Sequence, residues 1–209
     1  MQRTLEEITQ YIDHTLLKPY ASKEAMQAFC NEAKELKVKM VAINSYYTKF
    51  CKELLKDTTI HVGAAISFPL GQTTLDIKLA ETKQAIDDGA DEIDYVINIG
   101  KAKMHDWNYI EQEMRSIVEL CHENQVICKV IFENCYLTKD EIRKCAQIAK
   151  EVKPDFIKTS TGKGYPGASP EAAYVMCQVI RRYHELTGRK VGIKVSGGIR
   201  TAEDAVNYY

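Results

Sequence analysis

Two lysines lie inside short apolar segments that the sequence predicts to be buried strands. Lys158 lies in the segment DFIKTST, and Lys194 lies in VGIKVSGG. Lysine is rarely buried without a partner, and burial lowers a lysine pKa because it disfavours the ammonium form. A neutral amine is a nucleophile, so the pair indicates amine chemistry, most simply a Schiff base with a carbonyl substrate.

Further polar residues lie at alternate positions of similar segments, so that they share one face of a strand. Burying several charges for stability alone is unfavourable, because desolvation can exceed the attraction within an ion pair. We therefore expect a polar active site where the carboxyl ends of the strands meet. The charged residues predicted to face it are three acids and three lysines: Asp13, Asp94, Glu133, Lys129, Lys158 and Lys194.

Apolar segments alternate with amphipathic segments along the whole chain. Most of the apolar segments are continuous runs, as expected of parallel strands that are covered on both faces. This alternation fits a (β/α)8 TIM barrel or an open doubly wound sheet, and the polar face that the strands share favours the barrel. The expected strands are Ile12–Leu17, Met40–Ser45, Val62–Phe68, Glu92–Asn98, Ile127–Glu133, Phe156–Thr161 and Val191–Ser196.

Capping residues mark the helices that are expected between these strands. A Ser or Thr before an amphipathic segment can accept a hydrogen bond from a free amide of the first turn, and Thr138 with Glu141 has the spacing of a capping box. The expected helices are Ser22 to Lys37, Leu75–Asp88 capped by Thr73, Ile142–Val152 capped by Thr138, Glu171–Glu185, and a last helix starting at Thr201.

No linker or low-complexity segment divides the chain, which favours a single domain over residues 1–209. The last helix-like segment, Thr201–Tyr209, has no strand after it. From the spacing of the other strands, an eighth strand is expected to begin within roughly ten further residues. We therefore expect the natural polypeptide to continue beyond Tyr209 and the sequence to lack its eighth strand.

The composition excludes several classes of function. The 28 basic and 29 acidic residues give a formal net charge of -1, which offers no footprint for nucleic acid or an anionic membrane. There is no apolar run of about 18 residues that would span a membrane. The seven cysteines lack C-x-x-C spacing and the five histidines are scattered, which indicates reduced thiols in a cytoplasmic protein and no metal site.

Four motifs in series resemble those of the deoxyribose-phosphate aldolase family. They are IDHTLLKP at 12–19, DEID at 91–94, FIKTSTG at 156–162 and GIKVSGGIR at 192–200. The resemblance implies a class I aldolase on a (β/α)8 barrel, which reversibly cleaves 2-deoxy-D-ribose 5-phosphate to acetaldehyde and D-glyceraldehyde 3-phosphate. It also implies that the enzyme needs neither metal nor organic cofactor. The phosphate-binding loop after the family's eighth strand has no counterpart here.

The resemblance assigns three catalytic residues. Lys158 matches the Schiff-base lysine, Lys194 the second lysine and Asp94 the catalytic aspartate. Lys194 would be the cation that disfavours a second ammonium, although a structural ion pair with Asp94 or Glu133 is the plainer interpretation. Asp94 would act as general acid and base, or would merely neutralise the lysines.

Other polar residues are candidates for binding substrate. Asp13, Thr15 and Lys129 are hydrogen-bonding partners either for substrate hydroxyls or for the charged network. Glycines in the two loops after the lysine strands let the backbone approach an anion, which favours phosphate binding by Gly162, Lys163, Gly197 and Gly198. An ordinary turn explains the first of these loops equally well. Arg200 is either a phosphate partner or an exposed charge.

Two further functions fit the same residues. One is another Schiff-base aldolase or transaldolase acting on a sugar phosphate, and the other is a non-catalytic phosphosugar-binding protein. Binding alone does not require Lys158, Lys194 and Asp94 together, which favours an enzyme. Members of the family are often dimers or tetramers, so a homo-oligomer is expected.

Overall fold

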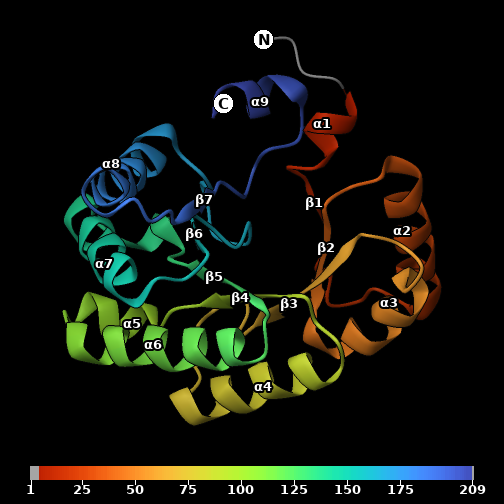
Figure 1. The fold of residues 1–209 in the computed structure, drawn as a ribbon, viewed down its shortest axis with the longest axis horizontal. Coiled ribbons are helices and arrows are strands. Elements are labelled where there is room, and N and C mark those ends of the chain that lie inside the picture. The colour runs from red at the N-terminus through yellow and green to blue at the C-terminus, as the bar shows by residue number, and fades with distance from the viewer. Residues whose placement is uncertain (1–4, 209) are drawn as a thin grey trace.

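Parallel strands form one curved sheet in the computed structural model, which describes residues 5–208. Each strand pairs with the next one in the sequence, so over these residues the order is β1 to β7 without a crossover. This is the order of a TIM-like α/β barrel, and the seven expected strands are all confirmed (Figure 1). The strands are β1 (Asp13–Leu16), β2 (Met40–Asn44), β3 (His61–Ile66), β4 (Glu92–Val96), β5 (Ile127–Ile131), β6 (Phe156–Lys158) and β7 (Gly192–Lys194).

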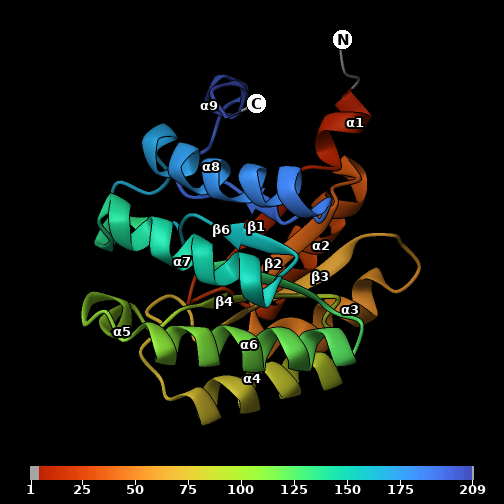
Figure 2. The ribbon, with the colours of Figure 1, turned by 60° about the vertical axis from the view of Figure 1, so that its left-hand side comes forward.

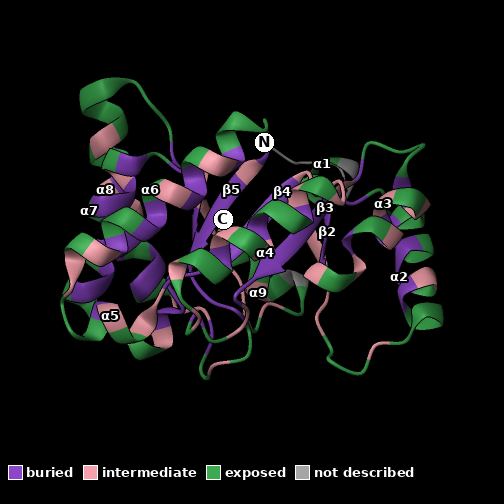
Figure 3. Ribbon diagram, turned by 90° about the horizontal axis from the view of Figure 1, so that it is seen from below, coloured by how far each residue is buried: buried purple, intermediate pink, exposed green. Residues whose placement is uncertain are grey.

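Helices cover the outer face of this sheet. Figure 2 shows α4, α6, α7 and α8 side by side along the outside, and Figure 3 shows that the helices turn exposed faces to solvent while β4 and β5 are buried. No helix among residues 5–208 is both long and apolar enough to cross a membrane. The helices are α1 (Leu5–Thr9), α2 (Lys23–Leu36), α3 (Thr48–Leu55), α4 (Leu75–Asp87), α5 (Ile99–Lys103), α6 (Trp107–Glu123), α7 (Lys139–Val152), α8 (Pro170–Thr187) and α9 (Ala202–Val206), with 3-10 turns at Ser45–Tyr47 and Asn134–Tyr136.

The strands end earlier than the apolar pattern predicts. For example, β5 ends at Ile131 instead of Glu133, and β6 ends at Lys158 instead of Thr161. The residues that follow are still buried, but they no longer have strand geometry. Glu133, for example, has a φ of 44°, which a β-strand does not allow. Alternation of polar and apolar residues therefore stops predicting side-chain direction at the strand ends.

The expected helix caps are confirmed with one exception. Ser22 and Thr201 each accept a hydrogen bond from an amide of the following turn, and Thr138 forms a capping box with Glu141. Thr73 was the wrong choice for α4, because the N-cap position is Thr74. The Thr73 hydroxyl instead hydrogen-bonds the hydroxyl of Ser67, at 2.8 Å.

The capping box of α7 makes stability depend on pH. Burial raises the pKa of Glu141, but hydrogen bonds from Lys103 and Thr138 outweigh it and lower the pKa to about 2. Because an unfolded glutamate has a pKa of about 4.3, this stabilisation is present above that pH and is lost as the pH falls through about 2. We expect Glu141→Gln to lower the free energy of unfolding at pH 7 by about 1 kcal/mol.

Urea unfolding at pH 7 and at pH 2.5 measures this dependence. The difference in free energy of unfolding between the wild type and Glu141→Gln should be smaller at pH 2.5 than at pH 7. Glu111→Gln is the matched control, since Glu111 forms an exposed pair with Arg115 one helix turn away. A gap that stays constant with pH, or that is equally large for Glu111→Gln, would contradict the assignment.

Candidate active site

Six charged side chains from five strands meet inside the curved sheet. Three are carboxylates and three are lysine ammonium groups, so the formal charges of these six residues sum to zero. Their side chains are between 3% and 18% exposed, which removes most of the screening that water would provide. The members of this inner cluster are Asp13 on β1, Glu92 and Asp94 on β4, Lys129 on β5, Lys158 on β6 and Lys194 on β7.

Asp94 lies between two of the lysines. Its Oδ2 accepts a short hydrogen bond from Lys158 Nζ, and its Oδ1 lies 3.3 Å from Lys129 Nζ. Burial raises the pKa of the Asp94 carboxyl, but the two ammonium groups outweigh burial and bring the pKa down to about 2. Asp94 is therefore ionised throughout the neutral range and holds Lys158 Nζ by a charge-assisted hydrogen bond.

Lys129 contacts more carboxylates than the other lysines of the inner cluster. Its Nζ forms an ion pair with Glu92 Oε2 and lies 3.4 Å from Asp13 Oδ2, in addition to its contact with Asp94. Burial lowers the pKa of Lys129, but the carboxylates of Asp94, Asp13 and Glu92 outweigh burial and raise the pKa above its ordinary value. Lys129 is therefore a permanent cation of the site.

Lys194 lies beside Lys158 and connects β7 to β1, the last and first strands of the described sheet, through Asp13. The two lysines are register partners on β6 and β7. The Nζ of Lys194 lies 3.0 Å from Asp13 Oδ1 and donates to the carbonyl of Tyr11 at 3.1 Å. Burial is the main reason why the pKa of Lys194 is lowered; Asp13 opposes this, whereas Lys129 and Lys158 add to it. Lys194 therefore has Asp13 as its ion-pair partner, not Asp94 or Glu133 as the plainer interpretation of the sequence had it.

The expectation that Glu133 faces the lysines was wrong. Its Oε1 accepts from the amide of Thr161 at 3.2 Å, and its Oε2 accepts a short hydrogen bond from the hydroxyl of the same residue. Glu133 thus ties the end of β5 to the loop after β6. The third acid of the inner cluster is Glu92, which the sequence analysis missed although it lies two residues before Asp94 and so on the same face of β4.

The two glycine loops that were expected to bind phosphate lie against each other. A Cβ on Gly197 would come within 3.1 Å of Gly162 Cα, and Gly197 has a φ of 86°, so only glycine fits there. Lys163 is exposed beside Gly162, and Gly198 is exposed beside Gly197. These residues form an open surface after β6 and β7, next to the lysine strands.

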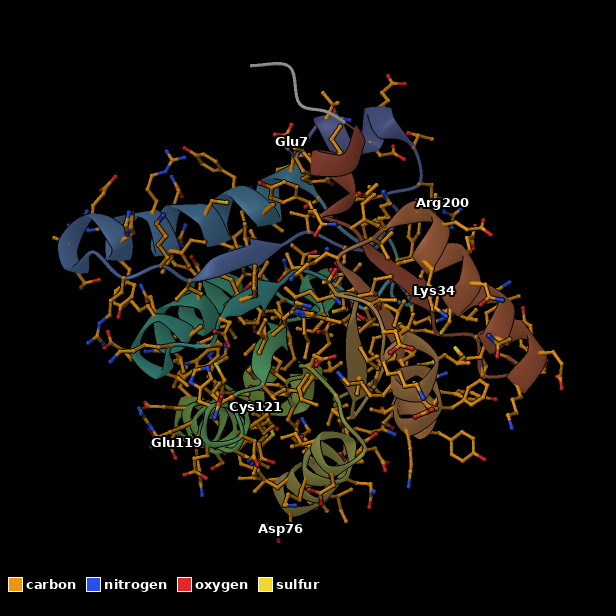
Figure 4. The ribbon with its side chains drawn as sticks, turned by 45° about the vertical axis from the view of Figure 1, so that its right-hand side comes forward. Glu7, Lys34, Asp76, Glu119, Cys121 and Arg200 are labelled. Carbon is orange, nitrogen blue, oxygen red and sulfur yellow. The ribbon has the colours of Figure 1, made fainter. Side chains whose placement is uncertain are left out.

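Thr15 and Arg200 also lie outside the inner cluster. Thr15 is exposed, and its hydroxyl donates to the carbonyl of Asp13 at 2.8 Å. Arg200 is also exposed, on the segment that leads from β7 to α9, where its amide donates to Asp204 (Figure 4). The structure thus brings Asp13, Lys129 and the three catalytic candidates together and leaves Thr15 and Arg200 at the rim.

A family model described as DeoC/LacD family aldolase matches residues 8–207. The chain belongs to this family. The deoxyribose-phosphate aldolase of Lactobacillus acidophilus is 54% identical over 204 residues, which cover 98% of this chain and 83% of that protein. The deoxyribose-phosphate aldolase of Thermococcus gammatolerans is 43% identical over 202 residues, which cover 96% and 87%.

Solved structures give the same result. The tetrameric deoxyribose phosphate aldolase of Aeropyrum pernix matches with a TM-score of 0.88 and 27% sequence identity, over 98% of this chain and 83% of that one. The family membership that the four motifs indicated is confirmed. In this DeoC/LacD family member, the inner cluster places a buried lysine, a second cation and an ionised carboxylate at one point, which is what carbonyl chemistry at an amine requires.

Proposed function

We propose that this protein reversibly cleaves 2-deoxy-D-ribose 5-phosphate to acetaldehyde and D-glyceraldehyde 3-phosphate through a Schiff base on Lys158. One observation carries the proposal: Lys158 and Lys194 are register partners, and the Lys158 amine contacts the ionised Asp94. The two curated relatives described above, both named deoxyribose-phosphate aldolase, support the choice of substrate.

The chemistry begins when Lys158 loses a proton to solvent, and its amine stays hydrogen-bonded near Asp94. The neutral amine attacks the aldehyde carbon C1 of the open-chain sugar, and loss of water from the carbinolamine leaves a protonated imine. A base removes the proton of the C3 hydroxyl, the C2–C3 bond breaks, and its electron pair moves into the imine to give an enamine. D-Glyceraldehyde 3-phosphate leaves; protonation of the enamine at C2 and hydrolysis then release acetaldehyde and restore Lys158.

The other charged residues of the inner cluster have supporting roles in this proposal. Lys194 is the second lysine beside Lys158, and Lys129 is a permanent cation that lies against Asp94. Asp13 holds both of them in place, at 3.0 and 3.4 Å. Thr15, at the rim, is placed to bind a substrate hydroxyl. The protein needs no metal or organic cofactor in this scheme, because the imine itself is the electron sink.

The phosphate is proposed to bind at the glycine loops, with Lys163 as its counter-charge and Gly162, Gly197 and Gly198 as its backbone cradle. We expect Lys163→Met to raise the KM for 2-deoxyribose 5-phosphate about tenfold, the loss of about one charge-assisted hydrogen bond. The KM for unphosphorylated 2-deoxyribose should stay unchanged. The control is Lys190→Met, which removes an exposed lysine next to the start of β7. Equal effects on both sugars would contradict phosphate binding by Lys163.

The reaction is tested by incubating the protein with 2-deoxyribose 5-phosphate and measuring acetaldehyde. Release of acetaldehyde supports the proposal. Cleavage of a ketose phosphate without acetaldehyde would favour the alternative aldolase or transaldolase. Binding of the sugar phosphate by folded protein without any cleavage would favour the non-catalytic alternative.

We also propose that residues 1–209 act as one domain, in a homo-oligomer, in the cytoplasm. The tetrameric structure of the Aeropyrum pernix relative supports an oligomer, either dimer or tetramer. The seven cysteines, all within the described residues, are free thiols, which supports a reducing compartment. Light scattering during gel filtration tests the oligomeric state.

A further inference from the structure

A chain of polar contacts leads from the inner cluster to the opposite end of the barrel. Glu92, whose side chain is 4% exposed, uses one oxygen for Lys129 and the other for His61, with 2.6 Å between Oε1 and Nδ1. The other ring nitrogen of His61, Nε2, lies 3.3 Å from Lys39 Nζ. His61 begins β3 and Lys39 precedes β2, so this chain ends at the amino-terminal edge of the sheet.

The two neighbours of His61 indicate which of its ring nitrogens donates. A carboxylate only accepts hydrogen bonds, so Nδ1 must donate to Glu92, and an ammonium only donates, so Nε2 must accept from Lys39. These two contacts favour the tautomer of His61 that has its proton on Nδ1. This tautomer directs its one donor at Glu92 and holds that carboxylate in a single orientation.

Glu92 is the partner that decides where Lys129 lies. The Lys129 ammonium forms its shortest contact with Glu92, whereas Asp13 and Asp94 lie at 3.4 and 3.3 Å. In this position Lys129 occupies Oδ1 of Asp94 and leaves Oδ2 to Lys158. A shift of Lys129 toward Asp94 would change which oxygen is free to accept the hydrogen bond from Lys158 Nζ.

We propose that Glu92, held by His61, is a positioning residue for the aldol reaction: it anchors Lys129 so that Asp94 stays available to Lys158. The inference rests on the proposed function. The alternative is a purely structural group of charges at the base of the barrel. A structural group would affect stability, whereas a positioning residue affects kcat without changing how substrate binds.

Variants at Glu92 and His61 separate these roles. We expect Glu92→Gln to lower kcat for 2-deoxyribose 5-phosphate about 10- to 100-fold, the range for a hydrogen bond to a charged group, with KM within about twofold. His61→Leu should lower kcat about tenfold. His61→Asn should restore most of the activity, because the Asn amide N–H lies where the imidazole Nδ1–H was.

The matched control is His122→Leu. His122 also pairs with a carboxylate near the amino-terminal edge of the sheet, at 2.9 Å from Asp155. Asp155 also accepts from the amide of Cys128, which is not part of the inner cluster. We expect His122→Leu to leave kcat unchanged. Thermal unfolding of every variant shows that the comparison is between folded proteins.

Nitrogen-15 NMR of labelled histidine provides a readout that does not depend on turnover. We expect His61 at neutral pH to be the Nδ1–H tautomer. An Nε2–H tautomer, a kcat for Glu92→Gln equal to that of wild type, or an equal loss in His122→Leu would each overturn the inference. If the wild type releases no acetaldehyde, both the proposed function and this inference fail. If the wild type is active and Glu92→Gln has an unchanged kcat, only the role of Glu92 fails.

Discussion

Replacing Lys158 with alanine is expected to lower kcat for 2-deoxyribose 5-phosphate by roughly four orders of magnitude or more, as when a covalent nucleophile is removed. Without the amine no imine forms, so the C2–C3 bond has no electron sink. Lys194 is not expected to take over the role, because its Nζ is bound to Asp13 and to the carbonyl of Tyr11. The loss should therefore appear in kcat and not as weaker binding.

The measurement is mass spectrometry after incubation with acetaldehyde and sodium borohydride. Borohydride reduces the imine to a stable two-carbon adduct, which peptide mapping should place on Lys158 of the wild type. Lys158→Ala should carry no adduct in the site. Lys194→Ala should still be modified on Lys158, but more slowly, because Asp13, which also contacts Lys129, loses its nearer partner.

Lys194 is the rival nucleophile that this experiment must exclude. Burial lowers its pKa, which is the property expected of a Schiff-base lysine. An adduct that maps to Lys194 in the wild type, and persists in Lys158→Ala, would exchange the roles of the two lysines. Lys139→Ala, at the exposed start of α7, is the control for nonspecific modification of surface amines.

The strands could be predicted from the sequence because parallel strands that are covered on both faces are continuous apolar runs. A charged residue inside such a run is conspicuous, which is why Lys158, Lys194 and Asp94 were recognised. Their common location follows from the fold, since every strand of the described sheet runs in the same direction. Fold class and catalytic candidates were therefore accessible without coordinates.

The ion pairs were not accessible, because they depend on side-chain reach across the barrel. Asp13 and Lys194 come from the first and last described strands and meet only when the sheet curves. Glu133 was wrongly expected among the residues that face the lysines, because the alternation of side-chain direction was extended beyond Ile131, the last residue of β5. Glu92 shares a face of β4 with Asp94 and could have been found by alternation, but its pairing with His61 on another strand could not.

A second buried ion pair, outside the inner cluster, has the largest expected effect on stability. Lys78 on α4 and Glu113 on α6 are both 0% exposed, with 2.7 Å between Nζ and Oε1. Lys78 also donates to the carbonyl of Val96, and Glu113 accepts from the amide of Asn98, at 2.8 and 2.9 Å. The pair thus fixes the end of β4, the strand that carries Asp94.

We expect Lys78→Met to lower the free energy of unfolding by about 3–5 kcal/mol, the cost of leaving one member of a buried pair uncompensated. Burial already lowers the pKa of Lys78 and raises the pKa of Glu113, so desolvation disfavours the charged form of both groups. Without Lys78, the Glu113 carboxylate must either remain charged in the core or take up a proton. Urea unfolding at constant protein concentration measures the loss.

The double variant Lys78→Met with Glu113→Gln distinguishes an uncompensated charge from lost packing. Glutamine keeps an acceptor for the Asn98 amide but carries no charge, so the double variant should recover more than half of the stability that Lys78→Met loses. Lys83→Met is the matched control on the same helix, since Lys83 and Asp87 form an exposed pair whose removal should cost under about 0.5 kcal/mol. If the double variant is no more stable than Lys78→Met, the loss comes from packing around the lysine stem, and the charge of Glu113 is not the cause.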